Sequence, residues 1–181
     1  MNNGGVIDRP GPVIWLMGLS GSGKTTLGRK LVAHYRAEGR RAEMIDGDAT
    51  RDFFEDRADY SRENRIANIK RVAFAAMLLS RQGVAVVISN ISPFEEARRF
   101  VRAKVPGYRE IYLKASAGEC AQRDAKGLYG GARNGQLTQV VGVDIPFEPL
   151  ASPDLVLETG SEPQERSFEK LLTFLKNRGS L

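Results

Sequence analysis

The chain has 181 residues and a formal net charge of +5 at pH 7, and its length suits a single domain with one sizeable core. The composition is that of a soluble globular protein, without an apolar run long enough to span a membrane, and the single Cys120 excludes an internal disulfide and fits a reducing cytoplasm. The scattered arginines favour a polyanionic small-molecule substrate over nucleic acid.

The first half of the chain predicts two strands, each followed by helical sequence. Residues 1–11 are polar and glycine-rich, and we expect a flexible leader ahead of a single domain over 12–181. The apolar run 13–17 predicts a buried strand, and a helix is predicted from 26 to a stop at Glu38-Gly39. Residues 42–45 predict the second strand, which ends at Asp46-Gly47-Asp48 before a short helical piece.

The second half continues the alternation. Ser61 is the expected N-cap of a helix over 62–82, whose apolar residues recur every three or four positions. The later elements are expected to be strands at 84–88, 110–113 and 155–157, and helices at 92–101, 117–123 and 163–177. Residues 124–149 carry five glycines and little periodicity, so we expect an irregular functional lid there.

This order predicts an α/β fold of three layers, a P-loop nucleoside triphosphate hydrolase-like parallel sheet with helices on both faces. Ligands of such sheets gather at the carboxyl ends of the strands. Residues 46–48, 89–93 and Lys114 all follow predicted strands. We therefore expect them to meet at one rim.

The segment between the first strand and helix, Gly18-Leu19-Ser20-Gly21-Ser22-Gly23-Lys24-Thr25, fits the phosphate-loop pattern G-x-x-x-x-G-K-[ST]. Its amides and the helix N-terminus suit a nucleoside triphosphate, whereas a glycine-rich turn that only joins strand to helix is the alternative. Lys24 is expected to reach the β- and γ-phosphates, and the Thr25 hydroxyl to bind Mg²⁺. The predicted ATP-binding residues are Gly18, Ser20, Gly21, Ser22, Gly23, Lys24, Thr25, Thr26 and, from the resemblance described below, Arg123.

Candidate acceptor residues follow the second strand. Asp48 and Arg51 are three apart, so both can face one cleft, where the carboxylate suits Mg²⁺ or an attacking hydroxyl and the guanidinium suits an anion. A helix-capping aspartate and a solvated arginine are the alternative. The single histidine, His34, lies within a predicted helix without a partner, so Asp48 is the natural base candidate.

A polar stripe marks the long predicted helix. Ser61, Arg65 and Asn68 are expected on one side of it, roughly opposite the apolar face. This stripe is either solvated surface or the wall of a cleft that binds phosphate and base. Tyr60, just before it, either stacks on a base or packs against the protein.

Several blocks resemble the adenylylsulfate (APS) kinase family over about residues 12–175. They are the phosphate loop, Asp46-Gly47-Asp48 with Arg51, Arg65 to Asn68 followed by Ile69-Lys70-Arg71, Ile91-Ser92-Pro93, Arg123-Asp124-Ala125-Lys126-Gly127-Leu128-Tyr129, and Gly142-Val143-Asp144 followed by Pro146-Phe147-Glu148.

The resemblance implies phosphoryl transfer from ATP to the ribose 3′-hydroxyl of adenylyl sulfate, giving ADP and 3′-phosphoadenylyl sulfate. It implies that Asp48 sits at the metal and the acceptor hydroxyl, and that Lys24 and Asp48 are the catalytic residues. The implied acceptor-binding residues are Asp48, Arg51, Tyr60, Arg65, Asn68, Ile91, Ser92, Lys126 and Leu128, with Ile91 and Ser92 binding through their backbone. Arg123 is implied near the ATP base. The family is often dimeric, which implies a homodimer, although the sequence itself does not give the oligomeric state.

Three positions depart from the family pattern, all on the acceptor side. Asn64 stands where the family usually has Asp, Val140-Val141-Gly142 replaces Phe-Thr-Gly, and Ser89-Asn90 precedes Ile91. Val140 cannot stack on an adenine as an aromatic ring does. A related kinase acting on another 5′-modified nucleotide, such as cytidine diphosphoramidate, is therefore the alternative function.

Two other classes fit the phosphate loop. A GTPase or ATP-driven motor would need an apolar strand that ends in aspartate, whereas the central run ends in Ile88-Ser89-Asn90. A nucleotide sensor without catalysis is disfavoured because Lys24, Thr25, Asp48 and Lys126 are all present.

Overall fold

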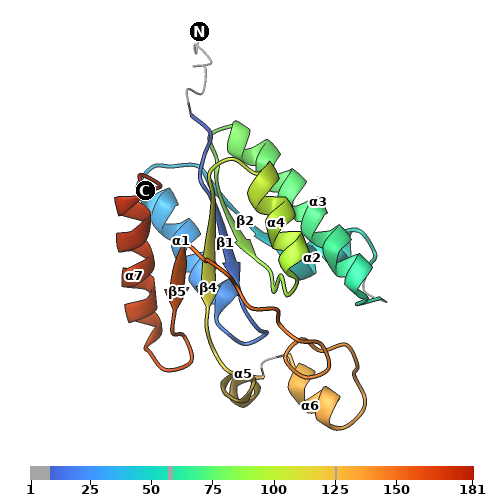
Figure 1. Ribbon diagram of the computed structural model, residues 1–181. Coiled ribbons are helices and arrows are strands. Elements are labelled where there is room, and N and C mark those ends of the chain that lie inside the picture. The colour runs from blue at the N-terminus through green and yellow to red at the C-terminus, as the bar shows by residue number, and fades with distance from the viewer. Residues whose placement is uncertain (1–8, 57–58, 125) are drawn as a thin grey trace.

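The computed structural model describes residues 9–56, 59–124 and 126–181. Within these ranges the sheet has five strands in the order β2-β3-β1-β4-β5, and every neighbouring pair is parallel. The strands are β1 (Val13–Met17), β2 (Ala42–Asp46), β3 (Ala85–Ser89), β4 (Tyr108–Leu113) and β5 (Leu155–Leu157). The expected three-layer architecture is confirmed (Figure 1).

Helices cover both faces of this sheet. The helices of the described residues are α1 (Lys24–Ala37), α2 (Gly47–Phe53), α3 (Arg62–Arg81), α4 (Glu95–Lys104), α5 (Ala117–Arg123), α6 (Leu128–Arg133) and α7 (Gln164–Asn177). Figure 1 shows α1 and α7 on one side of the sheet and α3 and α4 on the other. None of the helices in the described ranges is both long and apolar enough to cross a membrane.

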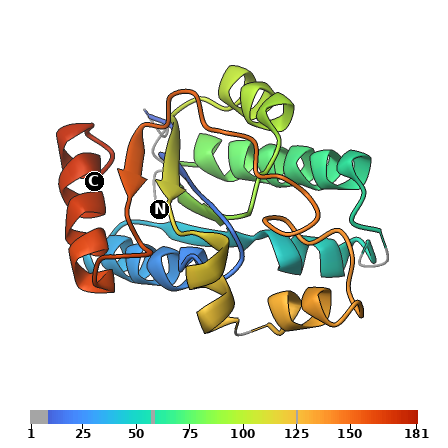
Figure 2. The same cartoon turned by 60° about the horizontal axis from the view of Figure 1, so that its bottom comes forward.

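Alternation along β1 divides the core into two layers. Ile14 and Leu16 pack with α1 and α7, while Val13, Trp15 and Met17 pack with α3 and α4. All five side chains are buried, as the continuous apolar run predicts for a central parallel strand. Burial on both faces holds the sheet rigid beneath its carboxyl edge, where α5 and α6 lie (Figures 1 and 2).

The helix boundaries show how local chemistry sets the elements. The Ser61 hydroxyl accepts a hydrogen bond from the Asn64 amide, as expected of the N-cap of α3. The helix α4 begins at Glu95 rather than at Ser92, because Ser92 adopts a left-handed conformation with φ of 51°. Of the expected leader, residues 1–8 lie outside the described residues, whereas the Gly11 amide donates to the Ser80 carbonyl at 2.7 Å.

Two sequence-based expectations are wrong: one concerns the secondary structure of residues 124–149, and the other concerns which face of α3 is buried. The segment 124–149 is not wholly irregular, since it contains α6, whose Tyr129 and Gly130 amides donate to the Asp124 carboxylate. Its paired glycines lower helix propensity and hid this turn of helix. The stripe on α3 is also misplaced: Arg65 and Asn68 are buried beside Ile69 rather than opposite the apolar face.

Candidate functional site

A cleft of about 710 Å³ opens at the carboxyl edge of the sheet. Its walls come from the phosphate loop, the ends of β2 and β3, α2, α3, and the segment from 123 to 141. Among the predicted site residues, only Gly18 and Ser92 fail to line it. The expected convergence at one rim is confirmed for residues 46–48 and 89–93, most of which line this cleft, whereas Lys114 does not line it and pairs with Glu158.

The Lys24 side chain folds back onto the phosphate loop. The Lys24 ammonium donates to the carbonyls of Gly18 and Leu19 at 2.9 and 2.7 Å. Burial lowers the pKa of Lys24 from its ordinary 10.5 to about 8. Gly18 shapes the loop instead of lining the cleft: its φ is 142°, and a Cβ there would lie 2.4 Å from the Leu113 carbonyl oxygen.

The Thr25 hydroxyl lies against a carboxylate that sequence reasoning did not select. Thr25 Oγ1 donates to Asp46 Oδ2 at 3.2 Å and lies 3.1 Å from the Ser89 hydroxyl. Asp46 and Ser89 are register partners at the ends of β2 and β3, so the sheet itself brings them together. The signal was present, since both residues follow predicted strands. Asp48 was preferred as the metal ligand, but its carboxylate pairs with Lys126 here.

An arginine pair forms the far wall. Arg51 and Arg65 are both buried, with their guanidinium carbons 4.7 and 5.1 Å from the Tyr60 ring centre. Burial, reinforced by the neighbouring Arg51, lowers the pKa of Arg65 to about 10. The two partners that Arg65 contacts are the main-chain carbonyls of Tyr60 and Gln139. Asp48 and Asp59 offset part of this charge, but neither guanidinium forms an ion pair among the described residues, so the cluster is suited to an anion.

Asn68 and Ile91 complete this wall, whereas Ser92 turns away. Asn68 donates to the Gly47 carbonyl at 3.2 Å, and its buried Oδ1 has no partner among the described residues. That orphaned acceptor is available to a hydrogen-bond donor on a ligand. The Ser92 hydroxyl instead accepts from the Trp15 indole at 2.9 Å, and its amide donates to Asn90.

The segment 124–149 closes over the cleft. Lys126 forms an ion pair with Asp48, and Arg65 donates to the Gln139 carbonyl at 2.6 Å. Leu128 and Val140 line the cleft from the same segment. These contacts bring Asp48 and Lys126 together at the mouth of the cleft, where both side chains remain more than half exposed.

At the opposite end, Arg123 donates to the carbonyls of Gly21 and Thr159. The cleft continues there along Thr159, Glu162, Gln164 and Ser167. These four residues were not predicted from the sequence, because nothing in their pattern marks the turn before α7 and the first turn of α7 as part of the rim. They come close only through the parallel pairing of β4 with β5.

The departure at Asn64 lies outside the cleft. Its amide nitrogen donates to Asp59 Oδ2 at 2.7 Å, within a small network at the start of α3. Hydrogen bonds from Ser61 hold the pKa of Asp59 below its usual range, and Asn64 adds to them. Asn64 therefore supports the helix start and gives no reason to doubt the acceptor. Ser89, Asn90 and Val140 do line the cleft.

Comparisons with known proteins agree with this geometry. The sequence model of the adenylylsulphate kinase family matches residues 10–158. The chain is 42% identical over 170 residues to a probable adenylyl-sulfate kinase of Aeropyrum pernix, covering 92% of this chain and 93% of the relative. It is 38% identical to an adenylyl-sulfate kinase of Picosynechococcus, covering 96% and 98%.

Solved structures give the same result. A Mycobacterium tuberculosis APS kinase in complex with AMPPNP and APS superposes with a TM-score of 0.86 at 29% identity, covering 93% of this chain and 99% of that one. A shikimate kinase from Aquifex aeolicus, at 16% identity and a TM-score of 0.53, shares the fold alone.

Proposed function

Because the chain belongs to the adenylylsulphate kinase family, we propose that it transfers the γ-phosphoryl group of ATP to the ribose 3′-hydroxyl of adenylyl sulfate. The products are ADP and 3′-phosphoadenylyl sulfate. The observation that carries the proposal is the charge layout of one cleft: a phosphate loop at one end, and a buried arginine pair at the other.

Asp48 lies between the two halves. Its charge affects the pKa of Lys24 in the phosphate loop and also that of Arg65 in the far wall. A hydroxyl that attacks the terminal phosphate must lie at this boundary. Asp48 can accept the hydroxyl proton there, and the hydroxyl oxygen then forms the new bond to phosphorus as the bond to the ADP oxygen breaks.

The remaining residues would position the acceptor nucleotide and neutralise the negative charge of the triphosphate. Lys24 would leave its two carbonyl partners for the triphosphate, which restores full charge on an ammonium whose pKa is about 8 when no anion is bound. Arg51, Arg65 and Asn68 would hold the sulfate and nucleotide of the acceptor. Lys126 brings a further positive charge from the covering segment, where its contact with Asp48 raises its pKa despite opposing burial.

Magnesium belongs to the proposal, with Thr25, Asp46 and Asp48 as its candidate holders. The fit rests on the Thr25 hydroxyl and the Asp46 carboxylate, which already point at each other. Within the described residues no cluster of three His, Cys, Asp or Glu could hold a metal, which suits an ion bound by few protein oxygens and by substrate phosphates. When bound, Mg²⁺ neutralises charge on the β- and γ-phosphates.

A homodimer and a cytoplasmic location are the finer parts of the proposal. Phe74 and Leu78 on α3 and Phe100 on α4 are exposed apolar side chains that a partner could cover. Light scattering after gel filtration tests this: a dimer elutes with about twice the chain mass of 19.9 kDa, and a monomer overturns this part alone.

The cytidine diphosphoramidate alternative is not favoured, because the curated relatives carry the adenylyl-sulfate kinase name. A panel of nucleotides with ATP and Mg²⁺, scored by ADP release, tests the acceptor. We expect rapid release with adenylyl sulfate, and at least about tenfold lower kcat/KM with AMP, which lacks the sulfate that the arginines bind. Faster turnover of a cytidine nucleotide would contradict the proposal.

A further inference from the structure

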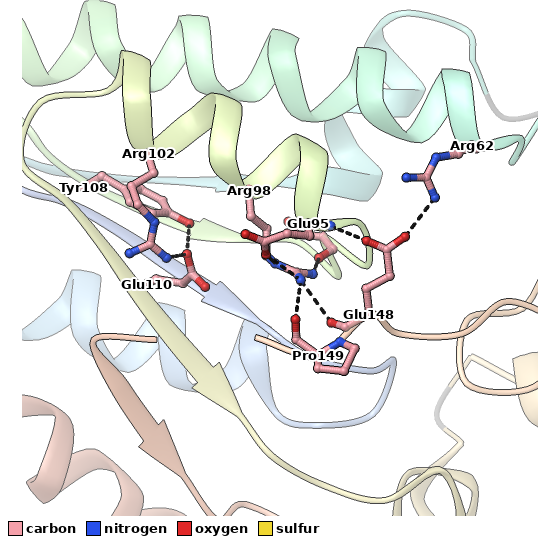
Figure 3. A network of polar contacts seen from close by, with 9 residues as sticks. Arg62, Glu95, Arg98, Arg102, Tyr108, Glu110, Glu148 and Pro149 are labelled. Carbon is pink, nitrogen blue, oxygen red and sulfur yellow. Dashed lines mark hydrogen bonds and ion pairs between the residues drawn. The ribbon is translucent and has the colours of Figure 1, made fainter. Parts of the chain in front are cut away.

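Arg98 on α4 has its guanidinium inside the protein, although it does not line the cleft. Its side chain is 1% exposed. Nη1 donates to the Ser92 carbonyl at 2.9 Å, Nη2 donates to the carbonyls of Glu148 and Pro149 at 3.0 and 2.8 Å, and Nε donates to the Glu95 carboxylate. Figure 3 shows the guanidinium between the start of α4 and the segment that carries Glu148.

Three of these partners are main-chain carbonyls from two separate segments. Ser92 belongs to the loop after β3, whose neighbours Ile91 and Pro93 line the cleft. Glu148 and Pro149 end the segment that covers the cleft. Because a guanidinium offers its donors in a fixed planar fork, one side chain contacts both segments at once and restrains their relative position.

Glu148 independently strengthens the junction between the loop 90–93 and the segment 146–149. Its amide donates to the Pro93 carbonyl at 2.9 Å, and its carboxylate accepts from the Glu95 amide and from Arg62. Partial burial acts to raise the pKa of Glu148, but these hydrogen bonds hold it below its usual range. The junction therefore contains both the Glu148 carboxylate and the Arg98 guanidinium as charged groups at neutral pH.

The junction reaches the cleft through a compact turn over residues 140–145. The Val140 carbonyl accepts from the amides of Val143, Asp144 and Ile145, and the Gly142 amide donates to the Ile145 carbonyl at 2.7 Å. A turn bonded this closely moves as one unit. Val140 and Val141 line the cleft, so a shift at Glu148 moves the cleft wall on the acceptor side.

We propose that Arg98 is a positioning residue that fixes the acceptor half of the cleft by joining the loop 90–93 to the segment 146–149. This inference rests on the proposed function. Arg98 does not line the cleft, and its hydrogen-bond partners among the described residues all lie outside the phosphate loop. Loss of the guanidinium hydrogen bonds should therefore weaken binding of the acceptor nucleotide and leave ATP binding nearly unchanged.

Steady-state kinetics of Arg98→Lys and Arg98→Met test the inference. Lysine keeps the charge and methionine keeps the bulk, but neither supplies the fork. We expect the KM for adenylyl sulfate to rise roughly tenfold or more, with the KM for ATP changed less than about twofold. If Arg98→Met does not fold, the two KM values of Arg98→Lys alone test the inference. Equal changes in both KM values, or no change, overturn the inference.

Arg102→Met is the matched control. Arg102 lies one turn further along α4 and pairs with the buried Glu110, on the side away from residues 146–149. Its loss destabilises the same helix through an uncompensated carboxylate. We expect it to leave the ratio of the two KM values unchanged. A ratio shifted as in Arg98→Lys would show that general loosening of α4 explains the effect, and would overturn the inference.

Hydrogen exchange separates this inference from the function it rests on. The Glu148 amide is bonded to Pro93, so its exchange should accelerate about tenfold in Arg98→Lys relative to the α1 amides. If the wild-type protein fails to use adenylyl sulfate but this acceleration is seen, the function is wrong and the junction stands. An unchanged Glu148 amide overturns the junction whatever the substrate.

Discussion

Replacing Lys24 by Met should stabilise the ligand-free protein while it abolishes phosphoryl transfer. Lys24 is buried, and its pKa falls from 10.5 to about 8, so the folded state at pH 7 bears a cost of about 3 kcal/mol for holding the ammonium. Methionine removes that cost and fills the same space. The two hydrogen bonds from Lys24 to Gly18 and Leu19 are lost, which offsets roughly 1 kcal/mol each. We therefore expect a net gain of about 1 kcal/mol, or roughly 2–4 °C in Tm.

The sign of the pH dependence follows from the direction of the shift. Below about pH 8 both folded and unfolded chains carry a protonated Lys24, and the whole cost is present. Between about pH 8 and 10.5 the folded state has lost the proton and the unfolded state keeps it, so wild-type stability rises with pH relative to the variant. The advantage of Lys24→Met should therefore shrink and reverse as pH increases.

Urea unfolding at pH 7 and pH 9.5 measures both effects. Lys30→Met, which changes a lysine on the outer face of the same helix, should show no such pH-dependent difference from the wild type. A Lys24→Met variant less stable than the wild type at pH 7, or a difference that is identical at the two pH values, would refute the reasoning.

Three further substitutions address the chemistry. Asp48→Asn should lower kcat about a hundredfold with little change in ATP affinity measured by calorimetry, since it removes the proton acceptor; equal losses in both would count against that role. Asp46→Asn should raise the Mg²⁺ concentration for half-maximal activity by about tenfold, because Asp46 contacts the Thr25 hydroxyl, and an unchanged magnesium titration would exclude it as a holder. Val140→Phe should lower the acceptor KM roughly two- to tenfold by adding an aromatic face to the cleft wall, whereas an unchanged KM would end the argument from the missing stack.

The sequence predicts the elements well because the signals are local. The apolar run of β1, the cap at Ser61 and the glycine stops after α1 and α3 depend only on neighbouring residues. The helix α6 was not predicted, because it contains two glycines and because the carboxylate that stabilises it, Asp124, lies before its first residue. Such a stop-and-start within a glycine-rich segment is not visible in periodicity.

The site was predictable to the extent that motifs carry it. The phosphate loop and the arginine pair line one cleft as expected. Asp46 was passed over because its role depends on register with Ser89, which is a property of the sheet and not of the local sequence. Ser92 was expected from the family motif to contact the acceptor through its backbone, but its amide donates to Asn90 and its carbonyl accepts from Arg98.

The position of the transferred phosphate tests the central claim most directly. The wild-type protein is incubated with ATP, Mg²⁺ and adenylyl sulfate, and the product is characterised by mass spectrometry and phosphorus NMR. We expect one new phosphomonoester, on the 3′ oxygen of the ribose, formed in equal amount with ADP. ADP formed with free phosphate alone, or a phosphate at another position, would contradict it.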